Sequence, residues 1–369
     1  MPGKVLLLTL KTFSATGGIE KVSRIMGKAL YERSVEQDGY FEICSMYDKQ
    51  TDAVDNPYFP AENFRGFGIR KLSFIRAMVA AGIKKDVVML SHINLLLIGW
   101  LIKKISPKTK IILLAHGIEV WYKFNTRTRV MLNACDHIIA VSKFTKNRIV
   151  DVHGFNESKC SVLNNCLDPF LPLPSVKFKY QALLKKYGFS ETDCILMTLT
   201  RMSSKERYKG YDKVIEAIAA LKNKQNNIKY LVAGSYDKQE KDFLDKLISR
   251  LNLQDNIVLA GFIKDEELEN HFAMSDIYVM PSQKEGFGIV FIEAMYYGLP
   301  VIAGNVDGSV DALLNGQLGQ LVNPDSTHEI AAGISNIIQD KKAFMPNRDL
   351  LEKHFGYEAY KQKLHSLLN

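Results

Sequence analysis

One segment in the second half of the chain carries the densest group of side chains suited to chemistry. Residues 281–295 read P-S-Q-K-E-G-F-G-I-V-F-I-E-A-M and contain two glutamates, Glu285 and Glu293, eight positions apart. Carboxylates accept hydrogen bonds from hydroxyl groups such as those of a sugar. Gly286 and Gly288 let a ligand approach the backbone closely, and the start of the following helix offers free N–H groups to a phosphate. The segment predicts a site for a ligand that carries both kinds of group.

A strand and a helix must position this segment. Residues 277–280 form a short apolar run that is typical of a buried strand, and the helix is predicted to begin near Gly288. Open parallel sheets bind ligands beyond the carboxyl ends of their strands, so the turn between these two elements is well placed for a site. The alternative is purely structural, with Glu285 as a helix cap and Glu293 as a solvated helix carboxylate.

The rest of the chain alternates short apolar runs with helical patterns, which indicates doubly wound α/β architecture. Most of the runs are continuously apolar, as expected where helices cover both faces of a parallel sheet. The first six predicted strands are residues 5–10, 41–46, 87–90, 110–115, 137–141 and 161–163. The second six are residues 195–200, 229–233, 257–259, 277–280, 301–303 and 319–322.

The two sets of strands predict two domains. Three prolines fall within residues 169–174, and proline removes a backbone donor and fixes φ, so this stretch suits neither a strand interior nor a helix. We expect a first domain over residues 1–168, a proline-rich hinge over 169–176 and a second domain over 177–350. Residues 351–369 show a helical pattern, and whether this last helix crosses back to the first domain stays open.

Charge is distributed unevenly between the two halves. The formal net charge is 48 − 40 = +8, of which residues 1–180 contribute 26 − 15 = +11 and residues 181–369 contribute 22 − 25 = −3. Five cysteines without a CxxC pair indicate free thiols in a reducing compartment. The longest apolar run, residues 93–102, is too short to span a bilayer, which takes about 20 apolar residues. A cytoplasmic protein is expected.

The segment E-G-F-G-I-V-F-I-E-A-M, from Glu285 to Met295, resembles the E-x7-E signature of retaining glycosyltransferases in the large family four. The resemblance extends along most of the chain, in the family's order. The other matching motifs are Gly17-Gly18-Ile19-Glu20-Lys21, His116-Gly117, Val141-Ser142-Lys143, Leu163-Asn164-Asn165, Thr200-Arg201, Lys209-Gly210, Ala233-Gly234 and Gly261-Phe262.

The resemblance implies the GT-B fold, in which two Rossmann-like, doubly wound domains face a central cleft. It implies sugar transfer from a UDP- or GDP-linked donor to a glycan or lipid-linked acceptor, as in bacterial cell-surface polysaccharide or glycoconjugate synthesis. No metal and no cofactor beyond the donor substrate is expected. The donor site carried over from the family consists of Gly17, Gly18, Arg201, Lys209, Gly261, Ile263, Glu285, Gly286, Phe287, Gly288, Ile289 and Glu293.

Arg201 and Lys209 are similar to the family's phosphate-binding pair. A guanidinium offers a planar fork of donors and an ammonium a compact charge, and both stabilise a diphosphate as it leaves. Residues 202–208 make the intervening loop slightly longer than is usual in the family, so Arg207 can take the place of either cation. The alternative is a solvated basic loop.

The resemblance assigns different tasks to the remaining residues. Glu285 is expected to contact the hydroxyl groups of the donor sugar and Glu293 those of the ribose. His116, at the end of a predicted strand, is expected beside the donor sugar, so that Glu285, His116, Arg201 and Lys209 form the catalytic set. Read without the family, His116 is a satisfied structural histidine, and Gly17 and Gly18 form a plain tight turn.

Thirteen basic residues against two acidic ones, Asp86 and Glu119, lie within residues 65–129. In the family the first domain receives the acceptor, so this stretch predicts either contact with an anionic membrane surface at the inner face of the plasma membrane or a solvated basic face. No nucleic-acid partner is expected, because the aromatic residues form no base-stacking motif, and a monomer is expected. The rival functions are a nucleotide-sugar epimerase of the same fold and a non-catalytic binder of anionic membrane or nucleic acid.

Overall fold

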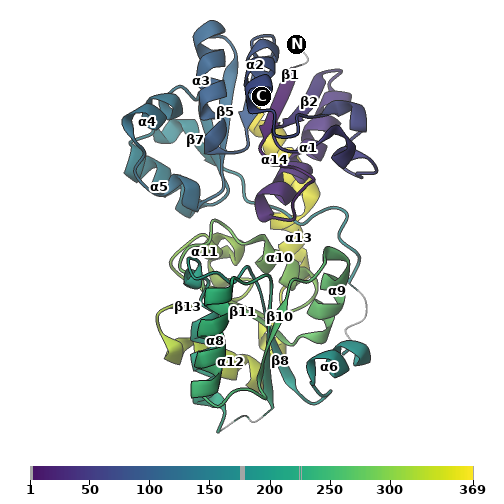
Figure 1. The fold of residues 1–369 in the computed structure, drawn as a ribbon, viewed down its shortest axis with the longest axis vertical. Coiled ribbons are helices and arrows are strands. Elements are labelled where there is room, and N and C mark those ends of the chain that lie inside the picture. The colour runs from purple at the N-terminus through teal and green to yellow at the C-terminus, as the bar shows by residue number, and fades with distance from the viewer. Residues whose placement is uncertain (1–2, 175–178, 224, 226, 369) are drawn as a thin grey trace. The chain divides into compact units, whose positions relative to one another are not determined.

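The computed structural model describes residues 3–174, 179–223, 225 and 227–368, and the chain divides into two compact units (Figure 1). The first unit comprises Met1–Phe170 together with Phe355–Asn369, and the second comprises Leu171–His354. Of the hinge predicted at 169–176, residues 175 and 176 lie outside the described residues, as does residue 177, where the second domain was predicted to begin.

The first unit is built on a seven-stranded parallel sheet with the order β3-β2-β1-β4-β5-β6-β7. Its strands are β1 (Lys4–Thr9), β2 (Tyr40–Ser45), β3 (Phe64–Gly66), β4 (Val87–Leu90), β5 (Lys110–Ala115), β6 (His137–Ala140) and β7 (Cys160–Val162). Six of them were predicted. The seventh, β3, reads Phe-Arg-Gly and contains a single apolar side chain, so no apolar run marks it in the sequence.

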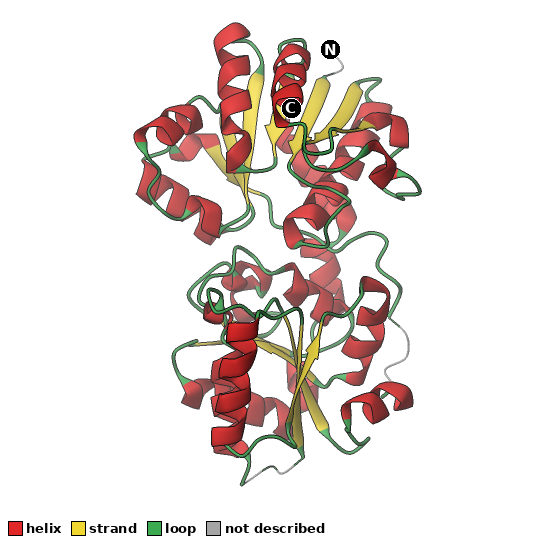
Figure 2. Cartoon of the chain, viewed as in Figure 1, coloured by secondary structure: helices red, strands yellow, loops and turns green. Residues whose placement is uncertain are grey.

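Helices cover both faces of this sheet (Figure 2). They are α1 (Gly18–Glu36), α2 (Lys71–Gly82), α3 (Leu96–Ile105), α4 (Thr126–Asn133), α5 (Lys143–His153) and α14 (Tyr357–Leu368). Along β1, Leu6 and Leu8 belong to one apolar cluster and Leu7 to another. Successive side chains of a strand point to opposite faces, so both faces are core and the strand is apolar from Val5 to Leu8.

The C-terminal helix α14 packs against α1 of the first unit. Leu364 is fully buried in the same cluster as Leu7, and the Tyr357 hydroxyl donates a hydrogen bond of 2.8 Å to Glu32 Oε2. The Lys361 ammonium lies 3.3 Å from the same carboxylate. These contacts answer the question that the sequence left open about the last helix.

The second unit is a six-stranded parallel sheet with the order β10-β9-β8-β11-β12-β13, again with helices on both faces. Its strands are β8 (Cys194–Leu199), β9 (Ile228–Ala233), β10 (Ile257–Gly261), β11 (Ile277–Met280), β12 (Val301–Gly304) and β13 (Gln320–Val322). Its helices are α6 (Gln181–Tyr187), α7 (Tyr211–Leu221), α8 (Lys238–Arg250), α9 (Asp265–Met274), α10 (Ile289–Tyr296), α11 (Ser309–Ala312), α12 (Thr327–Gln339) and α13 (Arg348–Phe355), the last ending at the unit boundary.

The strand order of the second sheet reverses between β8 and β11. From β8 the chain winds outward through β9 and β10, and it then returns to the other side of β8 with β11. The loops that leave two such strands diverge and open a crevice at their carboxyl ends, which is where doubly wound sheets bind ligands. Arg201 follows β8 and Glu285 follows β11, so both lie at this switch point.

Within the part of the chain that the structure describes, no helix combines the length and the apolar character needed to cross a bilayer. All five cysteines are free, and four of them are buried.

We predict that Leu364→Ala loosens the C-terminal helix. Truncating a fully buried leucine removes apolar burial and leaves a cavity, so the free energy of unfolding should fall by about 2–5 kcal/mol. Chemical denaturation measures this, with Gln362→Ala, an exposed position on the same helix, as the control expected to change stability by less than about 0.5 kcal/mol. Equal stability of the two variants would contradict the packing described above.

Candidate active site

An ion pair joins the loops that follow β8 and β11. Lys209 Nζ donates a hydrogen bond of 2.5 Å to Glu285 Oε2, and the side chains are only 16% and 18% exposed. Burial disfavours the charged ammonium, but the charge and the hydrogen bond of Glu285 outweigh it, and the pKa of Lys209 is raised. The lysine is therefore a fixed cation at the switch point, beside the carboxylate that the sequence singled out.

Backbone packing brings these two loops together. Gly210, directly after Lys209, has a φ of +80°, and a Cβ placed on it would lie 2.4 Å from the carbonyl oxygen of Pro281. Only glycine adopts this conformation at such a distance without strain. Gln283 N also donates a hydrogen bond of 2.8 Å to the carbonyl of Tyr208, so the loops are joined on both sides of the ion pair.

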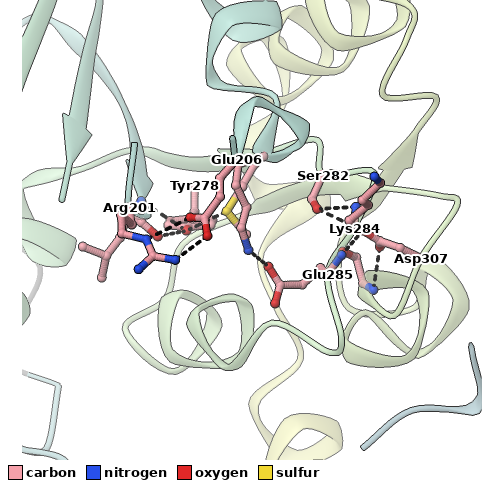
Figure 3. A network of polar contacts seen from close by, with 11 residues as sticks. Arg201, Glu206, Tyr278, Ser282, Lys284, Glu285 and Asp307 are labelled. Carbon is pink, nitrogen blue, oxygen red and sulfur yellow. Dashed lines mark hydrogen bonds and ion pairs between the residues drawn. The ribbon is translucent and has the colours of Figure 1, made fainter. Parts of the chain in front are cut away.

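Arg201 is held by a carboxylate from its own loop. Its Nε donates to Glu206 Oε2 at 3.0 Å and its Nη2 donates to Glu206 Oε1, an arrangement that Figure 3 shows as a two-pronged contact. The hydrogen bond to Glu206 raises the pKa of Arg201. The arginine side chain is 68% exposed. An exposed pair of this kind contributes little to stability, so the guanidinium remains available to an anion.

Arg207, the alternative cation, points to a different partner. Its Nε lies 3.0 and 2.8 Å from the two oxygens of Glu240, a fully buried carboxylate that also accepts a hydrogen bond of 3.0 Å from the Tyr211 hydroxyl. The guanidinium stacks over the Phe243 ring, 3.6 Å from its centroid. These contacts use Arg207 to neutralise Glu240, so the geometry favours Lys209 as the second cation of the site.

The segment after Glu285 folds as the sequence predicted. Gly288, with a φ of +85°, is the N-cap residue of α10, and the helix begins at Ile289. Phe287 is buried, and Glu293 lies one turn into the helix with only 4% of its surface exposed. The structural alternative is wrong on both counts, because Glu285 is not the cap and Glu293 is not solvated.

A third loop, after β12, reaches the site and was missed. Asp307 Oδ2 accepts hydrogen bonds from the backbone N–H of Glu285 at 2.6 Å and from the Ser282 hydroxyl at 2.9 Å (Figure 3). Glu206, the partner of Arg201, was also missed. The rule that ligand sites lie at the carboxyl ends of parallel strands points to Asp307, three residues beyond Gly304 at the end of β12, and could have identified it.

The ends of β8, β9 and β10 converge beside this cluster. Gly234, after β9, has a φ of +130° and donates its N–H to the carbonyl of Gly261 at 2.7 Å. A Cβ on Gly234 would lie 1.9 Å from the carbonyl oxygen of Thr200, so the three strand ends touch through their backbones. Gly261 has a φ of +73° and open space where a Cβ would stand, and Ile263 is buried.

His116 and the glycine loop belong to the first unit. His116 Nε2 lies 2.9 Å from the carbonyl oxygen of Ser91, and Glu119 Oε1 accepts the backbone N–H of His116 at 2.6 Å. The pKa of His92, next to Ser91, is lowered. Burial is the main cause and the charge of His116 adds to it, while the charges of Glu119 and Glu20 oppose it. The two histidines and the start of α1 follow β4, β5 and β1, so they lie at the carboxyl ends of three neighbouring strands of the first sheet.

Gly17 and Gly18 mark the start of α1, with Gly17 as its N-cap. A Cβ on Gly17 would lie 2.2 Å from Glu20 Oε2, so a larger residue there would displace that side chain. The loop before them is held by Asp48, a buried residue that the sequence did not reveal. It accepts backbone hydrogen bonds from Thr12 at 2.6 Å and Ser14 at 2.9 Å.

Two family models match the chain. Residues 16–169 match Glycosyltransferase Family 4, and residues 180–362 match Glycosyl transferases group 1. Together they cover nearly the whole chain, in the order that the motifs indicated. Both models describe glycosyltransferases, so the chain is similar to family four over its first half and to group 1 over its second.

Two curated relatives illustrate the proteins to which the chain is similar. A GDP-mannose-dependent alpha-(1-6)-phosphatidylinositol monomannoside mannosyltransferase of Mycolicibacterium smegmatis is 26% identical over 260 residues, covering 67% of this chain and 65% of the relative. The N-acetyl-alpha-D-glucosaminyl L-malate synthase of Bacillus anthracis is 25% identical over 353 residues, covering 91% of this chain and 88% of the relative. The chain matches between about half and two thirds of the length of the first curated relatives.

Solved structures establish the fold. The Anabaena protein HepE in complex with UDP has a TM-score of 0.81 at 19% identity, covering 99% of both chains. The sucrose-phosphate synthase of Thermosynechococcus elongatus has a TM-score of 0.75 at 19% identity, covering 99% of this chain and 98% of the other. The predicted GT-B fold, with two doubly wound α/β domains, is confirmed.

Among the residues with a described placement, no three His, Cys, Asp or Glu side chains are grouped so that they could hold a metal ion.

Replacing Arg207 tests whether this arginine neutralises Glu240 or binds the phosphates of a donor. Arg207→Met leaves the Glu240 carboxylate buried without its cation, so we predict a loss of about 2 kcal/mol in the free energy of unfolding. Lys205→Met, at an exposed position of the same loop, should leave stability unchanged. Thermal and chemical denaturation give both values. A variant of Arg207 with unchanged stability and a large loss of nucleotide affinity would show instead that this arginine binds the phosphates.

Proposed function

We propose that the chain is a retaining glycosyltransferase that moves a sugar from a nucleotide-diphosphate sugar to a glycan or lipid-linked acceptor in the synthesis of bacterial cell-surface glycoconjugates. The observation that carries the proposal is the Lys209–Glu285 pair at the switch point of the second sheet, with Arg201 on the same loop as the lysine. The second unit is then the donor-binding domain and the first the acceptor-side domain.

The chemistry requires charge separation at the anomeric carbon. The bond from that carbon to the phosphate oxygen breaks, the carbon gains positive charge, and the diphosphate leaves with negative charge. Arg201 and Lys209 stabilise the leaving group more in the transition state than in the ground state, which is the condition for catalysis. The acceptor oxygen bonds to the carbon on the face that the phosphate leaves, and its proton passes to a phosphate oxygen.

Each cation is already matched with a carboxylate before any donor arrives. Arg201 is paired with Glu206 on its own loop, and Lys209 is paired with Glu285 on the loop after β11, so each positive group is held by a carboxylate. Preorganised charges of this kind stabilise a transition state without having to reorient during the reaction. Fixed cations at the diphosphate supply the charge that a divalent ion would otherwise provide, so we propose a metal-independent reaction.

The two carboxylates serve binding rather than acid–base chemistry. Glu285, on the loop, is placed for the hydroxyl groups of the donor sugar, and Glu293, inside α10, for those of the ribose. A glycosidase would need two carboxyl groups about 5–5.5 Å apart, acting as acid and nucleophile. Here the partner of Glu285 is the ammonium of Lys209. A cation at this position stabilises a departing phosphate, whereas a glycosidase would need a second carboxyl group there.

The proposed acceptor-side domain has a surface that combines exposed aliphatic and basic side chains. At the start of α2, Ile69 and Leu72 are 75% and 73% exposed, and Arg70, Lys71 and Arg76 are exposed around them. Each basic residue near an anionic leaflet contributes about 1 kcal/mol, and exposed aliphatic groups add to it by leaving water. We propose that a monomer of this protein docks peripherally, through residues 65–129, on a cytoplasmic membrane face that carries the acceptor.

The donor nucleotide is either a uridine or a guanosine diphosphate in this proposal. Gly261 presents backbone groups rather than a selective side chain, HepE was solved with UDP, and the mycobacterial relative depends on GDP-mannose. A thermal-shift screen of nucleoside diphosphates identifies the base, because a ligand that binds the native state raises apparent stability by RT ln(1 + [L]/Kd).

We predict that Glu285→Gln lowers the rate of transfer at least about 100-fold, because the amide loses the charge that contacts the sugar and aligns Lys209. Acceptor-dependent release of nucleoside diphosphate, measured with the donor selected by the screen, reports the rate. Asp325→Asn, at an exposed partner of Gln283 in the same unit, is the matched control and should retain full activity. Full activity of the Glu285 variant would refute the site, and sugar conversion without an acceptor would favour the epimerase.

Membrane docking gives a separate prediction. Replacing Ile69 and Leu72 by serine should reduce flotation of the protein with vesicles that contain anionic phospholipid, and high salt should reduce it further. Val35→Ser, at an exposed aliphatic position on α1, is the control. If the unaltered protein fails to float with anionic vesicles, the basic stretch is a solvated face and the docking proposal falls.

A further inference from the structure

Asp307 is a deeply buried acidic group next to the proposed donor site. Only 1% of its surface is exposed, and its two carboxylate oxygens accept three hydrogen bonds. Oδ2 accepts from the Glu285 N–H at 2.6 Å and the Ser282 hydroxyl at 2.9 Å, and Oδ1 accepts from the Ser309 N–H at 2.9 Å. The family motifs in the sequence assign no role to this residue.

The loop that carries Asp307 holds the peptide groups of Glu285 from both sides. While Asp307 accepts the N–H of Glu285, the N–H of Gly308 donates to the carbonyl oxygen of Glu285 at 2.8 Å. A Cβ on Gly308 would lie 2.0 Å from the carbonyl oxygen of Gly286, so the two backbones are in direct contact. The direction in which Glu285 leaves its loop is therefore set by residues 307 and 308.

An ionised carboxylate in this position has an energetic cost. Burial raises the pKa of Asp307 to about 6, the hydrogen bond from the Ser309 N–H opposes the rise, and the charge of Glu285 adds to it. The ammonium of Lys209 is the positive charge that acts on the same cluster. Because this pKa lies above the ordinary 3.8, the folded state binds the proton more tightly, and ionisation of Asp307 lowers stability as the pH rises from 3.8 to about 6.

We propose that Asp307 is a positioning residue that fixes the backbone of Glu285 and so keeps the Glu285 carboxylate beside Lys209 and directed at the donor sugar. The inference rests on the proposed function for the meaning of Glu285, and on the hydrogen bonds alone for the positioning. An anionic acceptor is suited to this task, because a charged acceptor makes stronger hydrogen bonds to N–H and O–H groups than a neutral one.

Asp307→Asn is the decisive variant, because asparagine has nearly the same shape but replaces one acceptor oxygen with an NH2 group, which must face at least one of the three donors. The expected result is a fall in kcat of about 10- to 100-fold, as for a small displacement of a reacting group, with a smaller change in the KM for the donor. The acid limb of kcat in the unaltered protein should have its midpoint near pH 6, and this limb should disappear in the variant. Ser282→Ala, which removes one of the three bonds, should change kcat in the same direction by less.

Asp276→Asn is the matched control. Asp276 is also a partly buried acid of the second unit that accepts a backbone N–H, from Ile195 at 3.0 Å, but it precedes β11 at the opposite end of the sheet from the site. Its replacement should lower the melting temperature without moving kcat or the pH profile. If Asp307→Asn changes only the melting temperature, as the control does, the proposal is overturned.

Hydrogen exchange measured by mass spectrometry separates this proposal from the proposed function. Peptides that contain residues 282–288 should exchange faster in Asp307→Asn than in the unaltered protein, and at the unaltered rate in Asp276→Asn. Unchanged exchange overturns the positioning role even if transfer is observed. Faster exchange in a chain that transfers no sugar from any donor leaves the positioning role standing and removes the proposed function.

Discussion

The pairing of Lys209 with Glu285 is the interaction on which the rest of the site depends. Both side chains are more than four-fifths buried, and a charge withdrawn from water is stable only beside a partner. The two residues lie 76 positions apart, so the pair forms only where the loops after β8 and β11 meet. The hydrogen bonds from Gln283 to Tyr208 and from Glu285 to Asp307 hold the same two loops in position.

Parallel topology brings the loops together, and small residues allow them to touch. β8 and β11 are neighbours whose connections wind away in opposite directions, so their carboxyl ends are left free for residues that bind a ligand. Gly210, Gly234 and Gly308 stand where a Cβ would lie within 2.4 Å of a carbonyl oxygen. A larger residue at Gly210, which meets Pro281, would push the loops after β8 and β11 apart and separate Lys209 from Glu285.

The sequence predicted the strands better than the contacts made at their ends. Mostly continuous apolar runs predicted twelve of the thirteen strands in the described residues, because most of these strands bury side chains on both faces. The position of Asp307 after a strand marks it as a candidate, but its hydrogen bond with the Glu285 N–H, 22 positions away, exists only in the folded chain. The choice between Arg207 and Lys209 likewise required Glu240, which lies 33 positions beyond Arg207.

The paired charges also explain why net charge is a poor guide to this donor site. Arg201 with Glu206 and Lys209 with Glu285 add nothing to the formal sum, and the half of the chain that contains them has a net charge of 22 − 25 = −3. An anionic donor is therefore met by a few cations held at fixed positions, where local geometry matters more than total charge. The excess of +11 lies in the other half, with thirteen basic residues between 65 and 129. A diffuse excess of that kind acts over a large area, which matches a charged surface rather than a single small ligand.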